Sequence, residues 1–321
     1  MGRRRVRNLQ FLKAGEIFAY EPNAERAAEA AKEYKIKTVP TFEAGLALAP
    51  DAVVISTPPN HHLEYALACA RAKLPFFVEA SVIIEPGFDE LVKLTQAGAV
   101  GMPSSTMRFF EPIQKIKEVV DSGRLGNISN FVYIMGQYLP DWHPHEDITK
   151  FYVGRRETGG CREMVPFETE WLMWVFGKPK GLFCKKGKTS HLKADIDDTY
   201  AISLDFGKFW GHVMVDVVSR KAIRQIRITG DEGTLLWDWE SETVSIFDAK
   251  TKEWSHLKEA PGFRAPGYLA KENMYIAEME HFVKCVREKK NPAYSVRDDL
   301  FTLQLLNKCE ASSDESKYVK L

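Results

Sequence analysis

The stretch Pro50-Asp-Ala-Val-Val-Ile-Ser-Thr-Pro-Pro-Asn-His-His62, followed by Pro75-Phe-Phe-Val-Glu-Ala-Ser81, decides the fold of this chain. The unbroken apolar run over residues 53–55 is typical of a strand buried on both faces of a parallel sheet, and two prolines end it. Residues 63–73 are rich in alanine and favour a helix, and residues 76–78 form a second short apolar run. Strand, helix and strand within about 30 residues predict a βαβ unit.

Polar residues gather where these two strands end. Open α/β sheets bind their ligands outside the carboxyl ends of parallel strands. We therefore expect a ligand at this edge of the sheet. The residues that the sequence places there are Thr57, Pro58, Asn60, His62 and Glu79.

These residues also carry a resemblance to a known family. The turn at Thr57, with His62 after it and an apolar strand ending in Glu79, resembles the Gfo/Idh/MocA family of NAD(P)-dependent sugar oxidoreductases. Further pieces occur in that family's order: Met107-Arg-Phe109, Gly123-Arg-Leu-Gly126, Trp174-Val-Phe-Gly177 and Gly230-Asp-Glu-Gly-Thr-Leu235.

The resemblance implies an α/β protein with two domains. Residues 1–103 would form a Rossmann-type dinucleotide-binding domain, and residues 104–321 a C-terminal α+β domain with a large, mainly antiparallel sheet. It also implies NAD as the cofactor, or NADP, with Arg108 among the cofactor contacts. The implied activity is oxidation of a secondary hydroxyl of a sugar, inositol or nucleotide sugar.

The beginning of the chain departs from a dinucleotide fold. Such a fold starts with a strand and a Gly-x-Gly-x-x-Gly turn before its first helix, whereas a helix over residues 3–12 follows Gly2 directly here. The resemblance implies that Gly2 is the third glycine of that turn and that Gly2 and Arg3 contact the cofactor. The first strand is then missing, either because the stated start lies inside the turn or because the protein lacks this strand. Its neighbours would be left with unpaired backbone groups.

Glu21 ends the strand expected over residues 17–20. A carboxylate at this place accepts hydrogen bonds from the ribose hydroxyls of adenosine. It also repels a 2′-phosphate, so it favours NAD over NADP, although Arg26 lies near enough to weaken that preference. The alternative is a carboxylate that only water contacts in a turn.

Strands dominate the second half of the chain. Short loops at residues 206–209 and 248–252 predict hairpins, and Val213, Val215 and Val217 repeat with the period of a strand that has one apolar face. A wide apolar face is commonly covered by a partner, so we expect a homo-oligomer through this sheet. The expected strands are residues 128–135, 182–186, 199–206, 209–217, 223–229, 234–238 and 243–248.

At the positions expected to be catalytic, this chain has other residues than the family that it resembles. There, a lysine follows the strand-end glutamate, and a histidine on a helix of the second domain takes the proton of the substrate hydroxyl. The matching residues here are Ala80 and Phe167, and Glu163 matches a family aspartate. Because Ala80 and Phe167 cannot transfer a proton, either another side chain does so or the protein binds its ligands without turnover.

Four titratable residues are candidates for that proton transfer: Glu163, Glu168, His143 and His145. For the two glutamates the alternative is a carboxylate stabilised by the dipole at a helix N-terminus. For the two histidines the alternative is an ordinary surface residue. A His-x-His pair without a further histidine is a weak metal signal, so we expect no metal.

A long polar and aromatic loop leaves the strand that ends near residue 135. Such loops carry binding residues more often than scaffold residues. The two arginines suit the phosphate of a nucleotide sugar and equally suit a solvated surface. The candidate substrate contacts are Tyr138, Trp142, Tyr152, Arg155 and Arg156.

Composition excludes several classes of protein. Lysine plus arginine and aspartate plus glutamate each number 44, so the chain lacks the basic excess of a nucleic-acid-binding protein. No apolar run approaches the roughly 18–20 residues that span a bilayer. The five cysteines have no CxxC spacing, which favours a reducing compartment. We therefore expect a cytoplasmic protein that binds a small molecule.

Overall fold

The computed structural model describes residues 1–142, 147–264 and 271–321. They form two compact units, each assembled from separate stretches of the chain. The predicted boundary near residue 103 lies close to the point where the chain passes from unit 1 into unit 2, at residues 106–107. A single boundary does not describe the two other stretches that cross between the units, residues 81–84 and 263–298. Unit 1 comprises Met1–Ala80, Glu85–Thr106 and Phe263–Asp298, and unit 2 comprises Ser81–Ile84, Met107–Gly262 and Asp299–Leu321.

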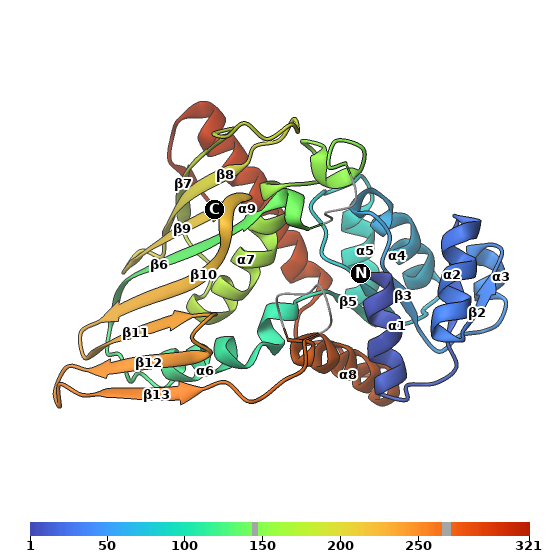
Figure 1. The fold of residues 1–321 in the computed structure, drawn as a ribbon, viewed down its shortest axis with the longest axis horizontal. Coiled ribbons are helices and arrows are strands. Elements are labelled where there is room, and N and C mark those ends of the chain that lie inside the picture. The colour runs from blue at the N-terminus through green and yellow to red at the C-terminus, as the bar shows by residue number, and fades with distance from the viewer. Residues whose placement is uncertain (143–146, 265–270) are drawn as a thin grey trace. The chain divides into compact units, whose positions relative to one another are not determined.

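Unit 1 alternates helices with short parallel strands (Figure 1). The predicted βαβ unit is confirmed, because β3 and β4 pair in parallel with Val53 opposite Phe76. The elements are α1 (Gly2–Phe11), β1 (Phe18–Tyr20), α2 (Ala24–Tyr34), β2 (Lys37–Val39), α3 (Phe42–Leu46), β3 (Val53–Ile55), α4 (His62–Arg71), β4 (Phe76–Val78), α5 (Phe88–Gln96), β5 (Gly101–Pro103) and α8 (Asn273–Glu288).

The strands of unit 1 belong to two separate sheets. One sheet is the pair β1-β2, and the other has the order β3-β4-β5. Within the described residues, no strand precedes α1, and β1 and β3 each pair along one edge only. The strand that precedes the first helix of a doubly wound fold lies between these two neighbours. β1 exposes two of its three residues, whereas β4 and β5 are buried throughout.

Unit 2 is built on a nine-stranded sheet with the order β13-β12-β11-β10-β6-β9-β8-β7-β14. All neighbours are antiparallel except β6 and β9, which are parallel. The elements are α6 (Glu111–Asp121), β6 (Ile128–Tyr138), α7 (Cys161–Phe176), β7 (Gly181–Gly187), β8 (Thr199–Asp205), β9 (Trp210–Asp216), β10 (Val218–Gly230), β11 (Gly233–Asp238), β12 (Thr243–Asp248), β13 (Trp254–Lys258), α9 (Val296–Glu315) and β14 (Val319–Lys320).

One face of this sheet forms the core of unit 2. The alternating valines of β9 are buried there, together with apolar residues of α6, α7 and α9. The predicted hairpins are confirmed, since β8 pairs with β9 and β12 pairs with β13, both antiparallel. The side chains that alternate with the core residues point to the opposite face.

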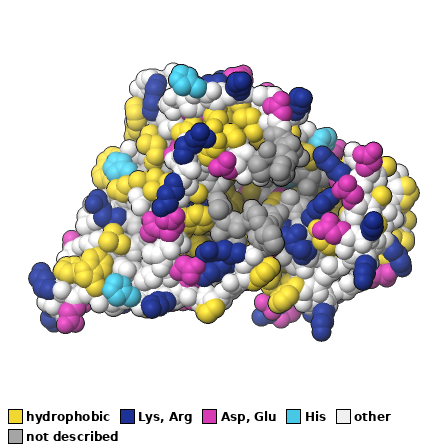
Figure 2. All heavy atoms as spheres, viewed as in Figure 1, with side chains coloured by type: hydrophobic (Ala, Val, Ile, Leu, Met, Phe, Trp, Pro, Cys, Tyr) yellow, Lys and Arg dark blue, Asp and Glu magenta, His cyan; other side chains and the backbone are white. Residues whose placement is uncertain are grey.

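Charged side chains of both signs are mixed on the face that Figure 2 shows. Figure 2 shows lysine or arginine beside aspartate or glutamate over most of the visible face, without a large region of one sign. Among the described residues, no helix combines the length and the apolar composition that crossing a bilayer requires. All five cysteines lie in the described part of the chain, where they are buried and form no disulfide.

Candidate active site

The turn after β3 is held by a buried histidine of α4. The Nε2 atom of His62 lies 2.8 Å from the carbonyl oxygen of Thr57. Burial lowers the pKa of His62, so the neutral imidazole donates its Nε2–H to this carbonyl. The Oγ1 atom of Thr57 is buried and has no hydrogen-bond partner among the described residues. A buried hydroxyl without a partner, at the carboxyl end of a parallel strand, fits the polar group of a ligand.

A buried arginine of α1 fixes the end of the neighbouring strand β4. The Nε and Nη2 atoms of Arg5 donate to the two carboxylate oxygens of Glu79 at 2.7 and 2.8 Å. The Ser56 hydroxyl donates to the same carboxylate at 3.1 Å. Burial alone would raise the pKa of Glu79, but the charge and hydrogen bonds of Arg5 outweigh burial and lower it. Glu79 is therefore ionised, and both of its carboxylate oxygens accept hydrogen bonds from side chains at the carboxyl end of the sheet.

Arg5 also binds the carboxylate of a residue that is distant in sequence. Its Nη1 atom lies 2.8 Å from Oε2 of Glu278 in α8. Glu278 in turn accepts hydrogen bonds from the Ser104 hydroxyl, the Ser105 N–H and the Thr106 hydroxyl at 3.0, 2.7 and 2.9 Å. This cluster, Arg5 with Glu79 and Glu278, joins α1, β4, α8 and the segment after β5.

The other predicted cofactor residues of unit 1 lie near the start of α1 or in exposed turns. A Cβ atom on Gly2 would lie 3.7 Å from Cβ of Ser56, so the N-terminus of α1 meets the end of β3. Arg3 was predicted to contact the cofactor, but its guanidinium forms ion pairs with Glu29 and Glu33 of α2. Pro58 and Asn60 are exposed.

Glu21 follows β1, where the sequence predicts a ribose contact. One of its oxygens accepts the N–H of Asn23 at 3.0 Å, which holds the carboxylate at this turn. The N-terminus of α1, the Thr57 hydroxyl and the Glu21 carboxylate thus suit the phosphates and ribose of a dinucleotide.

In unit 2, glycines pack the segment before α7 tightly against its own turns. A Cβ atom on Gly154 would lie 1.9 Å from the Ile148 carbonyl oxygen, and one on Gly159 would lie 2.1 Å from Cα of Val153. Any larger residue at either position would displace the backbone. Gly160, with φ of 61°, then turns the chain into α7.

This packing brings Tyr152 to the first turn of α7. The Tyr152 hydroxyl lies 3.3 Å from Oε1 of Glu163. The second oxygen of Glu163, Oε2, is buried and has no hydrogen-bond partner among the described residues. Burial raises the pKa of Glu163 to about 7, although the hydrogen bond from Tyr152 acts against that rise. A carboxyl group with these properties both holds and releases a proton near neutral pH, as a general acid or base must.

Glu168 lies on the same helix but inside the core. It is fully buried and accepts hydrogen bonds from the Tyr133 hydroxyl, the Arg224 guanidinium and the Trp171 indole N–H. A substrate cannot reach a carboxylate enclosed in this way. The structure therefore speaks against Glu168 as a proton acceptor and assigns it to a buried ion pair with Arg224.

Two predicted arginines are already paired. Arg156 donates to Asp195 and Asp197 at 2.6 and 3.0 Å, so its guanidinium is not presented to a phosphate. Arg108 forms an ion pair with Glu170 and lies over the Trp174 ring at 5.6 Å, which speaks against its expected place at the cofactor.

The remaining predicted residues have varied surroundings. Arg155 is exposed, and the guanidinium of Arg220 lies over the Tyr138 ring at 4.0 Å. The Nε1 atom of Trp142 is buried and has no partner among the described residues, so Trp142 remains a candidate substrate contact. His143 and His145 lie outside the described residues.

Comparison with known proteins agrees with the geometry of both units. The description "oxidoreductase family, NAD-binding Rossmann fold" matches residues 3–87, and the description "GFO/IDH/MocA C-terminal domain" matches residues 113–236. Together the two family models match more than half of the chain.

A relative and two solved structures extend the likeness over most of the chain. The chain is 24% identical over 298 residues to myo-inositol 2-dehydrogenase of Thermotoga maritima, covering 84% of this chain and 80% of that protein. An oxidoreductase from Agrobacterium radiobacter, solved with NAD+, L-tartaric acid and magnesium, has a TM-score of 0.84 at 16% identity and covers 99% of this chain and 95% of its own. Levoglucosan dehydrogenase, solved with NADH and levoglucosan, has a TM-score of 0.81 at 16% identity, covering 98% and 95%. The chain therefore belongs to the Gfo/Idh/MocA family of oxidoreductases and has that family's NAD-binding Rossmann fold.

Proposed function

We propose that this protein uses NAD to oxidise a secondary hydroxyl of a sugar, inositol or nucleotide sugar, and that Glu163 accepts the hydroxyl proton. The observation that carries the proposal is the Glu163 carboxyl group, with its pKa of about 7 and its buried Oε2 atom without a partner. Support for the substrate class comes from the curated relative, which is named as an inositol dehydrogenase, and from the levoglucosan dehydrogenase fold.

The proposed roles follow from the contacts of Glu163. Bound NAD would supply the hydride acceptor for the oxidation of the carbinol carbon. The ionised Glu163 carboxylate takes the hydroxyl proton on Oε2, while the Tyr152 hydroxyl holds Oε1 at 3.3 Å. In the opposite direction the protonated carboxyl returns that proton to the carbonyl oxygen. A pKa near the working pH makes both forms of the group available.

Ala80 and Phe167 favour a second function, the binding of NAD and a sugar without turnover. Neither side chain transfers protons, and both stand where the chain's resemblance to its family implies catalytic residues. The two functions separate when the protein is mixed with NAD and a panel of polyols, sugars and nucleotide sugars. NADH absorbance that grows with enzyme concentration supports the dehydrogenase. Calorimetric binding of both ligands without NADH formation, on either side of neutral pH, supports the binding protein instead.

Glu21 gives a prediction about cofactor choice. We expect Glu21→Ala to reduce the preference for NAD over NADP by about 10-fold, because one carboxylate–ribose hydrogen bond and one charge repulsion amount to about 1.4 kcal/mol. Calorimetric dissociation constants for the two cofactors, compared with those of Glu25→Ala in exposed surroundings on α2, measure the change. An unaltered ratio in Glu21→Ala would remove Glu21 from the cofactor site.

The open face of the large sheet suits a second copy of the chain. It exposes a set of large apolar side chains between polar ones: Phe183, Trp210, Met214, Leu236 and Trp254. Nine strands about 4.8 Å apart and about six residues long present on the order of 800 Å², which is the area that each partner buries in an interface of standard size. We propose that two copies pair through this face.

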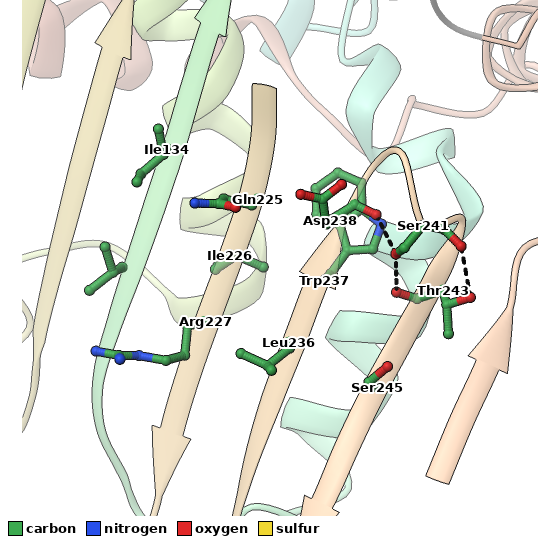
Figure 3. A pocket seen from close by; sticks show the side chains of 11 residues that line it. Ile134, Gln225, Ile226, Arg227, Leu236, Trp237, Asp238, Ser241, Thr243 and Ser245 are labelled. Carbon is green, nitrogen blue, oxygen red and sulfur yellow. Dashed lines mark hydrogen bonds between the residues drawn. The ribbon is translucent and has the colours of Figure 1, made fainter. Parts of the chain in front are cut away.

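A depression of about 440 Å³ lies over β6, β10, β11 and β12 of that face (Figure 3). Val132 and Ile134 of β6 and Leu236 of β11 line it, with Gln225 and Arg227 of β10 between these strands. Apolar walls with a few polar groups are typical of the buried centre of an interface.

Leu236→Asp is therefore expected to turn a dimer into a monomer, because it places a charge in the desolvated centre of the interface. Light scattering on a sizing column measures the mass. Leu48→Asp changes a comparably exposed leucine of unit 1 and is expected to leave the dimer intact. A monomeric unaltered protein, or a dimeric Leu236→Asp, would contradict the proposed interface.

A further inference from the structure

Arg162, the second residue of α7, binds three separate stretches of unit 2. Its Nε and Nη2 atoms donate to the carboxylate of Glu310 in α9 at 2.7 and 3.4 Å. Its Nη1 atom donates to the carbonyl oxygens of Val82 and Glu157, the latter at 2.8 Å. The Tyr200 hydroxyl donates to Glu310 at 3.3 Å and holds that carboxylate in place.

Val82 lies in the segment Ser81–Ile84, which belongs to unit 2 although it comes directly after Glu79 and Ala80 of unit 1. Val82 is buried, and its carbonyl oxygen receives a charged donor, which makes a stronger bond than a neutral one. Arg162 therefore holds the first residues that follow Ala80. The peptide before this segment carries the cofactor edge of β4, and the residue after Arg162 is Glu163.

The guanidinium is suited to this task in a way that an ammonium is not. Its planar fork binds both oxygens of Glu310 and still directs Nη1 to two carbonyl oxygens. A lysine has its three N–H donors on one nitrogen at the end of a flexible stem, so it cannot bind both oxygens of Glu310 in parallel and also reach two carbonyl oxygens from a second nitrogen. The side chains of Arg162 and Glu310 are 14% and 25% exposed, so water screens these bonds only in part.

We infer that Arg162 is a positioning residue, which holds the segment Ser81–Ile84 and the first turn of α7 in one fixed arrangement and so sets the place of the Glu163 carboxyl. This inference rests on the proposed function of Glu163. No geometry in the described residues requires Arg162 to touch the substrate or the cofactor, so its effect reaches the reaction through Glu163.

The test compares Arg162→Lys and Arg162→Ala with the unaltered protein. We expect kcat to fall by about 10- to 100-fold, the range that follows from displacing a catalytic group by about 1 Å, with KM for NAD little changed. Added guanidinium ion should restore part of the kcat of Arg162→Ala and none of that of Glu163→Gln. Hydrogen exchange should become faster in peptides that contain residues 81–84. Arg124→Lys, an exposed arginine of unit 2, is the control and should match the unaltered protein.

The exchange measurement separates this inference from the proposed function. If Glu163→Gln keeps full activity, the role of Glu163 fails, while exchange at residues 81–84 still reports whether Arg162 holds that segment. Unchanged exchange in Arg162→Lys and Arg162→Ala would overturn the inference. Faster exchange with kcat unchanged would also overturn it, because Arg162 would then be structural only. Should Arg162→Ala fail to fold, Arg162→Lys and Glu310→Gln give the same comparison.

Discussion

Replacing Glu163 by glutamine is expected to lower kcat for NAD reduction by about 10²–10⁴-fold with little change in KM. Glutamine keeps the shape of the side chain and the hydrogen bond with Tyr152 but cannot take a proton, and losing a general base typically has an effect of this size. Steady-state kinetics with the best substrate of the panel measures it. Glu118→Gln, on the exposed side of α6, should leave kcat unchanged. A kcat near the unaltered value in Glu163→Gln would exclude Glu163 as the base.

The pKa of about 7 gives this prediction a pH dependence of known sign. In the oxidising direction kcat should rise with pH through about 7, because only the ionised carboxylate accepts a proton. The stability should move the opposite way. The pKa of Glu163 is higher in the folded protein than the value of about 4.3 in an unfolded chain, so its stabilising contribution is full below about pH 4.3 and is lost as pH rises through about 7.

The loss amounts to about 4 kcal/mol above pH 7, from a pKa difference of about 2.7 between the folded and unfolded states. Glu163→Gln does not titrate, so its melting temperature should exceed that of the unaltered protein at pH 8 and approach it near pH 4. Higher stability with lower activity would show that the lost activity does not come from unfolding.

The second large effect is expected at Arg5. Arg5→Met should destabilise the protein by about 3–5 kcal/mol, because it leaves Glu79 and Glu278 buried without their cation. Arg3→Met, two residues earlier in the same helix, removes exposed ion pairs with α2 and should change stability by at most about 1 kcal/mol. Thermal and urea unfolding compare the two variants under one set of conditions.

Acid should narrow the difference between Arg5→Met and the unaltered protein. Without Arg5, the two largest effects that lower the pKa of Glu79 are lost, and burial raises it, so the folded variant takes up protons at a higher pH. The unaltered protein loses the stabilising contribution of Glu79 as pH falls below about 4.5 toward the lowered pKa. A deficit in Arg5→Met that grew on acidification would contradict this account.

The sequence predicted a strand most accurately where an unbroken apolar run was ended by prolines or polar residues. The ranges of β3 and β4 agree with the predicted apolar runs, because prolines or short polar segments mark their ends. β2 and α3 were not predicted, because neither contains an unbroken apolar run. For β13 the sequence predicted the hairpin that leads into it but not its range, because the strand lies at the edge of the sheet with no fully buried residue.

The candidate site was predictable only where its parts are close in sequence. Glu163 follows a glycine pair at a helix start, so a sequence pattern marks it. Glu168 comes five residues later, about 140° around the helix, where its carboxylate faces Tyr133 of β6 and Arg224 of β10. That geometry, with the distant partner Arg224, places Glu168 in the core. Arg5 gave no local sign of its role, since Glu79 lies 74 residues away.

The return of α8 to unit 1 affects the order of events during synthesis. Ser104 and Glu278, which are hydrogen-bonded, lie 174 residues apart in the chain. At about 5–20 residues per second, a ribosome needs on the order of 10–35 s to make that stretch. Arg5 and Glu79 are thus made long before Glu278 exists to complete their cluster. The N-terminal stretches of unit 1, which end at Thr106, therefore stay incompletely packed and accessible to chaperones and proteases until α8 has been translated.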